Sequence, residues 1–120
     1  MKMRCECGEI ISDQTDCLPY KAHFISDQDW FGVFDAIDLI VSDVAAGRMK
    51  VDDAQTAVRR VHLAAFRHMY QCGKCGRLLV ADLQHNTNIY APTSGADSRQ
   101  ILRSHDDAPV AIHASCGPGP

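Results

Sequence analysis

The sequence lacks any long apolar run. Its most apolar stretch, residues 30–46, is interrupted by Asp35, Asp38 and Asp43, whereas a helix that spans a bilayer needs about 20 largely uncharged residues. The first residues also lack the apolar segment of roughly 7 to 15 residues that marks a secretory signal. We therefore expect no membrane span and a cytoplasmic location, where thiols stay reduced.

No motif typical of an enzyme is visible either. The sequence has no glycine-rich phosphate-binding loop and no nucleophile elbow, and its six histidines form no recognisable acid–base pairing. Cys72-Gly73-Lys74-Cys75 follows a predicted helix and precedes a predicted strand, which is the reverse of a thioredoxin-like redox motif. The His-x-Glu and Pro-Cys-x-x-Cys pair of zinc deaminases is absent. We expect a non-catalytic protein.

The chain has no excess of positive charge. Its formal net charge is −3, and residues 1–53 contain five Lys or Arg against eleven Asp or Glu. Nucleic-acid-binding surfaces usually present a basic stripe with interleaved aromatic residues. The basic candidates here form at most a small patch, namely Arg59, Arg60, Arg67, Lys74 and Arg77. A basic protein is therefore a better expected partner than a nucleic acid.

What remains is ordinary globular composition. The chain has 120 residues, of which 46% are hydrophobic and 22% charged, and this is the size of a single domain. We expect one domain over residues 1–92. Residues 93–120 are rich in Ser, Asp, Ala, Gly and Pro, which predicts a peripheral, partly irregular tail.

The hydrophobic pattern predicts short strands at both ends of the domain. Residues 2–6, 9–12 and 20–25 have the composition of short extended segments. Residues 77–83 predict a strand, 86–88 a turn, and 89–91 a short return strand. The middle of the chain has a different period.

Between these segments, apolar residues recur at helical spacing. A first helix is predicted after Ser26 or Asp27, which can cap it, with Gly47 as its stop. A second apolar stripe runs from about residue 52 to residue 70. The short connection indicates an antiparallel helical hairpin. We expect this hairpin to provide most of the buried apolar area.

Three aromatic residues start the first predicted helix: Trp30, Phe31 and Phe34. We expect them in the hydrophobic core. The alternative is an exposed anchor, because aromatic side chains are typical hot spots of protein interfaces.

Two cysteine pairs are the sharpest signal. Cys5 and Cys7 lie in one pair and Cys72 and Cys75 in the other, and each pair is followed by Gly. Structural zinc takes four ligands, with sulfur at about 2.3 Å. The sequence therefore predicts one structural Zn²⁺ ion bound by these four cysteines, although iron suits four thiolates too. Cys17 and Cys116 lie outside the pairs and are predicted to be ordinary buried or free thiols.

The two pairs resemble the zinc-ribbon class, in which two knuckles share one structural ion. The resemblance covers residues 3–12 and 70–91. It implies an α+β fold of zinc-ribbon-like β-hairpins joined by a four-cysteine metal site, with the helical hairpin inserted between the knuckles. The Cys-x-Cys spacing and the long insertion depart from the simple ribbon.

Several stretches are similar to a family of small bacterial cytosolic proteins that includes immunity partners of secreted toxins. These stretches are residues 11–16, 18–22, 26–31 and 70–78. The resemblance implies a protein that binds a basic toxin domain and occludes its active site. The alternative is a zinc-ribbon module of transcription or translation that binds nucleic acid.

Charge and helix position give the candidate contact residues for a basic partner. They are the acidic residues of the first predicted helix, Asp27, Asp29, Asp35, Asp38 and Asp43.

Overall fold

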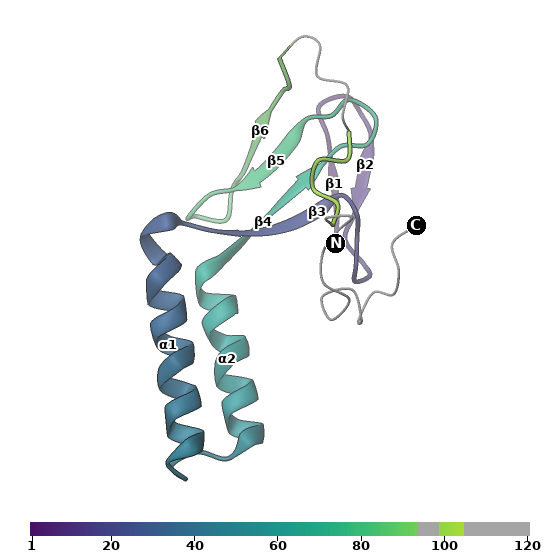
Figure 1. The fold of residues 1–120 in the computed structure, drawn as a ribbon. Helices are drawn as coiled ribbons and strands as arrows, with labels where there is room; N and C mark the ends of the chain where they lie inside the picture. The colour runs from purple at the N-terminus through teal and green to yellow at the C-terminus, as the bar shows by residue number, and fades with distance from the viewer. Residues whose placement is uncertain (94–98, 105–120) are drawn as a thin grey trace. The chain divides into compact units, whose positions relative to one another are not determined.

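A computed structural model describes residues 1–93 and 99–104 of the chain. The described residues form two helices and antiparallel strands (Figure 1), which confirms the predicted α+β class. Most of the predicted tail, Cys116 included, lies outside the described residues.

The chain divides into two compact units. Residues 1–22 and those from His68 onward belong to the first, here named the cysteine unit, and His23–Arg67 form the second, here named the helical unit. All four predicted metal ligands lie in the cysteine unit. Both predicted helices lie in the helical unit.

The strands form two sheets. β1 (Lys2–Arg4) pairs with β2 (Ile10–Ser12), with Met3 opposite Ile11. The second sheet has the order β3-β4-β5-β6, with β3 at Lys21–Ile25, β4 at Phe66–Gln71, β5 at Leu78–Ala81 and β6 at Thr87–Tyr90. In its antiparallel register Tyr70 lies opposite Leu79, and Leu79 opposite Ile89. The short strands predicted at both ends of the domain are thus present.

The strand β4 corrects the sequence prediction. Helix α2 (Val51–Ala65) ends at Ala65 and does not continue to residue 70. The segment from Phe66 to Gln71 contains aromatic residues that suit a strand as well as a helical stripe. Its backbone pairs with β5, so tertiary pairing decides between the two.

Helix α1 (Asp27–Ala45) has the predicted boundaries and the caps that explain them. The Ser26 side chain accepts a hydrogen bond from the Gln28 backbone N–H at 3.3 Å. At the other end Gly47 has a φ of +76°. The Gly47 N–H donates to the Val44 carbonyl and the Arg48 N–H to the Asp43 carbonyl, which is a Schellman motif that a glycine favours.

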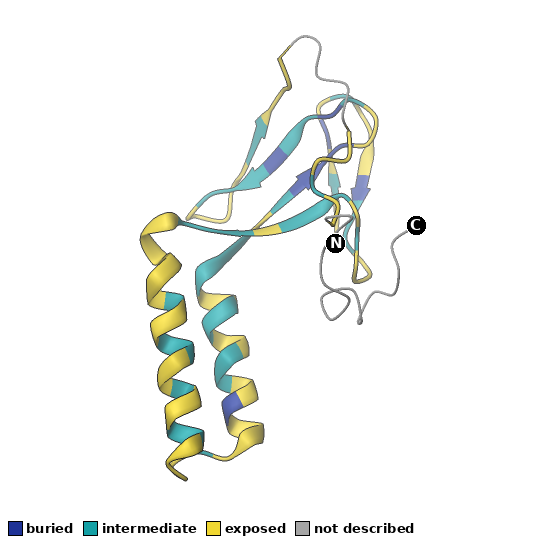
Figure 2. Cartoon of the chain, viewed as in Figure 1, coloured by how far each residue is buried: buried dark blue, intermediate teal, exposed yellow. Residues whose placement is uncertain are grey.

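The helical hairpin is not the main source of burial, contrary to the prediction. Helices α1 and α2 pack against each other, but α1 has no buried residue and α2 has only Ala54 (Figure 2). Trp30, Phe31 and Phe34 are 44%, 74% and 44% exposed, so their expected place in the core is wrong. Two helices alone bury only the strip where they meet. Neither described helix is long and apolar enough to cross a membrane.

The buried core lies in the cysteine unit and is built around thiols. Its buried members are Cys5, Ile11, Tyr70, Cys72 and Leu79. Met3, Cys7, Tyr20, Cys75 and Ile89 pack against them. The two cysteine pairs therefore occupy the centre of this unit and not its rim.

A polar network closes one side of this core. The Asp13 carboxylate accepts hydrogen bonds from Lys21 Nζ at 2.8 Å and from the Tyr70 hydroxyl. The hydrogen bonds from Lys21 and Tyr70 lower the pKa of Asp13 below its ordinary value. Burial and the same Asp13 carboxylate raise the pKa of Tyr70. The network links the turn after β2 to strands β3 and β4.

We predict that Asp13→Asn destabilises the protein by about 1–3 kcal/mol near neutral pH, because a charge-assisted acceptor is lost. A lowered folded pKa contributes stability that is present above the unfolded value and is lost as the pH falls through the folded pKa. The difference between wild type and variant is therefore constant above pH 3.8 and shrinks below it.

Urea unfolding across this pH range measures the difference. Asp16→Asn, which changes an exposed carboxylate of the same turn, is the control and leaves stability nearly unchanged. Equal effects of the two substitutions would show that the network contributes nothing.

Candidate metal centre

The two cysteine pairs are held by similar backbone turns. The Cys5 N–H donates to the Glu9 carbonyl and the Gly8 N–H to the Cys5 carbonyl, both at 2.9 Å. The second pair repeats this arrangement: the Cys72 N–H donates to the Arg77 carbonyl and the Gly76 N–H to the Cys72 carbonyl, again at 2.9 Å. Each turn joins two antiparallel strands, β1 to β2 and β4 to β5.

The glycines after the pairs have backbone conformations that other residues rarely adopt. Gly8 has a φ of +97° and Gly76 a φ of +80°, in the left-handed region where a Cβ is unfavourable. A Cβ on Gly76 would also lie 3.6 Å from Pro92 Cγ. The requirement for glycine is thus conformational at both turns.

The structure brings together all four cysteines that the sequence predicts as ligands. Their Sγ atoms lie within 4.8 Å of one another, with Cys5 and Cys75 at 3.4 Å and Cys7 and Cys72 at 3.6 Å. These separations exceed the disulfide bond length of about 2.0 Å, and all four thiols are free. Sulfurs bound at 2.3 Å to one tetrahedral ion stand about 3.8 Å apart. Two of the sulfur–sulfur separations thus lie close to this value, and the four sulfurs are near enough to one another to hold one metal ion.

Burial and hydrogen bonds give the thiols unequal acidity. Burial raises the pKa of the Cys5 thiol to about 12. Burial opposes ionisation of Cys75 as well, but hydrogen bonds from the Arg77 backbone and side chain lower the pKa of Cys75 to about 6. Arg77 Nε also lies 3.8 Å from the Glu6 carboxylate. Because metals bind thiolates, a bound cation would replace the remaining thiol protons.

Gln71, which sequence analysis missed, supports the second turn from inside the core. It is 2% exposed and directly precedes Cys72. Its Nε2 donates to the Gly76 carbonyl at 3.3 Å, and its Oε1 accepts from the Ile101 N–H at 2.9 Å. One side chain thus fixes both the glycine of the turn and a segment thirty residues later.

The five predicted partner contacts all lie on α1, but they do not form one face. At about 100° per residue, Asp27, Asp35 and Asp38 fall within about 80° of one another around the helix. Asp29 and Asp43 lie on the other side of α1. Asp43 also forms an ion pair with Arg48 at 3.0 Å.

Cys17 is disulfide-bonded, so the prediction of an ordinary buried or free thiol at this position is wrong. Cys17 is exposed and has a φ of +64°. It lies in the loop between β2 and β3 and is not part of the four-sulfur cluster.

Comparison with known proteins identifies the family of this chain. A family described as "Domain of unknown function (DUF8617)" matches residues 1–94. The chain belongs to this family. The DUF8617 match includes both cysteine pairs and the helical hairpin between them, so the hairpin is part of the family domain. No curated protein and no solved structure matches the chain.

We predict that Gln71→Leu in this DUF8617 domain lowers the free energy of unfolding by about 2–4 kcal/mol. The substitution keeps an apolar side chain of similar size but removes the partners of a buried carbonyl and of the Ile101 N–H. Chemical denaturation measures the loss.

The matched control is Gln84→Leu, which changes an exposed glutamine in the turn between β5 and β6 and leaves stability within about 0.5 kcal/mol. A Gln71→Leu protein as stable as the wild type would rule out the supporting role of this side chain.

Proposed function

We propose that the four cysteines bind one Zn²⁺ ion and that this ion is structural. The observation that carries the proposal is the convergence of four free thiols whose sulfurs lie within 4.8 Å of one another. Four protein ligands complete the coordination of zinc and leave no position for a water nucleophile. The site therefore has no catalytic role.

The position of the two turns supports a ribbon-like arrangement of this site. Each cysteine pair lies where one antiparallel strand leads into the next, as in two knuckles that share an ion. The ion would connect residues 5 and 7 to residues 72 and 75 and so close the long loop that contains the hairpin. Closing a loop of this length restricts the unfolded chain and stabilises the fold.

We predict that Cys72→Ser changes the metal content from one zinc per chain to none and lowers the free energy of unfolding by several kcal/mol, because a buried ligand of a structural ion is lost. Native mass spectrometry gives the metal and its identity, and thermal unfolding gives the stability.

Lys74→Gln is the control, because it alters an exposed residue of the same turn that is not a ligand. It keeps one zinc. A metal-free Cys72→Ser protein that is as stable as the wild type would contradict a structural ion, and iron in place of zinc would correct its identity.

For the protein as a whole, the proposal is non-catalytic recognition of a basic protein partner in the cytoplasm. Helix α1 carries five Asp and neither Lys nor Arg, and four of these five residues are exposed. Such a surface attracts a basic surface and raises the rate of association. A toxin domain with a basic active-site cleft, neutralised by a bacterial immunity protein, is a partner of this chemistry.

We predict that Asp35→Lys together with Asp38→Lys slows association with the partner by at least about tenfold at low salt, with folding intact. The partner is first identified by native mass spectrometry of the protein purified gently from its own host. Stopped-flow or surface-binding kinetics then give the rate.

Asp29→Lys is the control on the other side of α1, and it is expected to change the association rate by about twofold or less. Unchanged association of the Asp35/Asp38 variant would remove this surface from the interface. Co-purification with RNA in place of a protein would favour the nucleic-acid alternative and contradict the proposal.

A further inference from the structure

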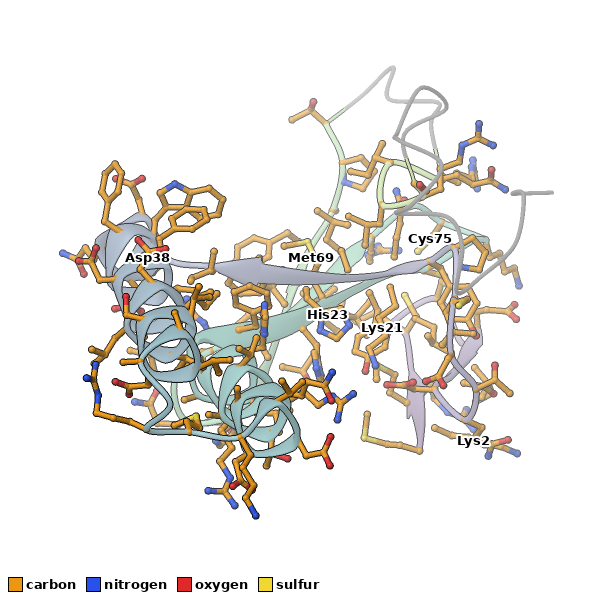
Figure 3. All side chains as sticks on the ribbon, turned by 60° about the horizontal axis from the view of Figure 1, so that its bottom comes forward. Lys2, Lys21, His23, Asp38, Met69 and Cys75 are labelled. Atoms are coloured by element: carbon orange, nitrogen blue, oxygen red, sulfur yellow. The ribbon has the colours of Figure 1, made fainter. Side chains whose placement is uncertain are left out.

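Helix α1 leaves most of its apolar side chains in solvent. Trp30, Phe34 and Val41 are 44%, 44% and 60% exposed, and Val51 at the start of α2 is 58% exposed. In Figure 3 ring side chains project together from one end of α1, above the label of Asp38. Scattered apolar residues are normal on a surface, but a contiguous patch of this kind marks an interaction site.

Helix geometry places three of the exposed apolar side chains of α1 on one face of the hairpin. Trp30, Phe34 and Val41 fall within about 40° of one another, at about 80° from the line through Val33, Ile40 and Val44 that faces α2. The Trp30 and Phe34 rings also contact each other edge to face, with their centroids 5.0 Å apart.

Helix α2 contributes to the same face. Val51, Gln55 and His62 lie at about 80°, in the same rotational sense, from the line through Ala54, Val61 and Ala65 that faces α1. The two helices are antiparallel. Residues that lie at the same angle, in the same rotational sense, from the inward-facing line of each helix are therefore on the same side of the hairpin. We name this side the aromatic face: Trp30, Phe34, Val41, Val51, Gln55 and His62.

The charges next to the aromatic face differ between the helices. On α1 the face is bordered by Asp27 and Asp38, whereas on α2 it is bordered in its C-terminal half by Arg59. Two α1 helices placed against each other through this face would therefore bring Asp27 and Asp38 of one copy close to the same residues of the other. An α1 against an α2 brings opposite charges together.

We infer that the aromatic face binds a second copy of this chain, so that two hairpins form an antiparallel four-helix bundle. A two-fold axis parallel to the helices places α1 of each copy against α2 of the other, which is the pairing that the charges favour. Every neighbouring pair of helices is then antiparallel, as in up-down bundles. The dimer gives α1 the buried residues that it lacks in one chain.

Sedimentation of the zinc-loaded full chain, from micromolar to submillimolar concentration, tests this inference. The expected result is a change from 13.2 kDa to twice that mass as concentration rises. Trp30 is the only tryptophan, so its emission reports the same equilibrium and shifts to shorter wavelength as the dimer forms. No partner protein is needed, so this result is independent of the proposed recognition function.

Two single variants separate the aromatic face from exposed apolar surface in general. Phe34→Glu raises the dissociation constant of the dimer by at least about tenfold, since it buries a charge in the interface. Leu39→Glu adds the same charge to an exposed position on another side of α1 and leaves the constant within about threefold. Circular dichroism verifies that both variants keep their helices.

A charge swap tests the pairing of the helices. Arg59→Asp weakens the dimer, and Asp38→Arg in the same chain restores part of the loss when α1 lies against α2 of the other copy. A chain that is monomeric at every concentration overturns the inference and leaves the aromatic face to another occupant. Equal effects of Phe34→Glu and Leu39→Glu, or a dimer that neither variant weakens, place the contact elsewhere and also overturn it.

Discussion

The convergence of four cysteine sulfurs is the constraint on which the rest of the structure depends. Cys5 and Cys72 are themselves core residues, 2% and 0% exposed, and the apolar residues of the cysteine unit pack around them. The thiols thus occupy space in this core that aliphatic side chains fill in many other small domains. A bound ion would turn four separate contacts into one centre and hold two distant segments of chain together.

The helical unit, in contrast, has almost no buried core. Helix α1 is capped at both ends and the two helices share an apolar strip, yet they enclose only Ala54, because two cylinders in contact along one line leave most of each surface open. The family match nevertheless spans this hairpin. A hairpin that belongs to the domain but has no core of its own is suited to presenting a surface, and both the acidic residues and the aromatic face are parts of that surface.

Residues next to the cysteines in the sequence shape the turns and the acidity of the four-sulfur site. Gly8 and Gly76 permit the two turns, Gln71 ties the second turn to the segment at Ile101, and Arg77 lowers the pKa of Cys75. These residues contact the ligands or the turns that carry them. They would fix the positions of the sulfurs without binding the ion.

The sequence by itself determined the elements whose signals are local. Cysteine spacing identified the four clustered thiols, Ser26 and Gly47 set the ends of α1 through hydrogen bonds within a few residues, and composition indicated the short strands, although Thr87 and Asn88, predicted as a turn, lie in β6. Only the tertiary structure decided where these signals compete or depend on distant partners. Residues 66–71 suited both helix and strand until β5 paired with them, and Gln71 gained its role from Gly76 and Ile101. The aromatic residues of α1 stayed in solvent because burial depends on what packs against a helix, and helical periodicity specifies a face without specifying its partner.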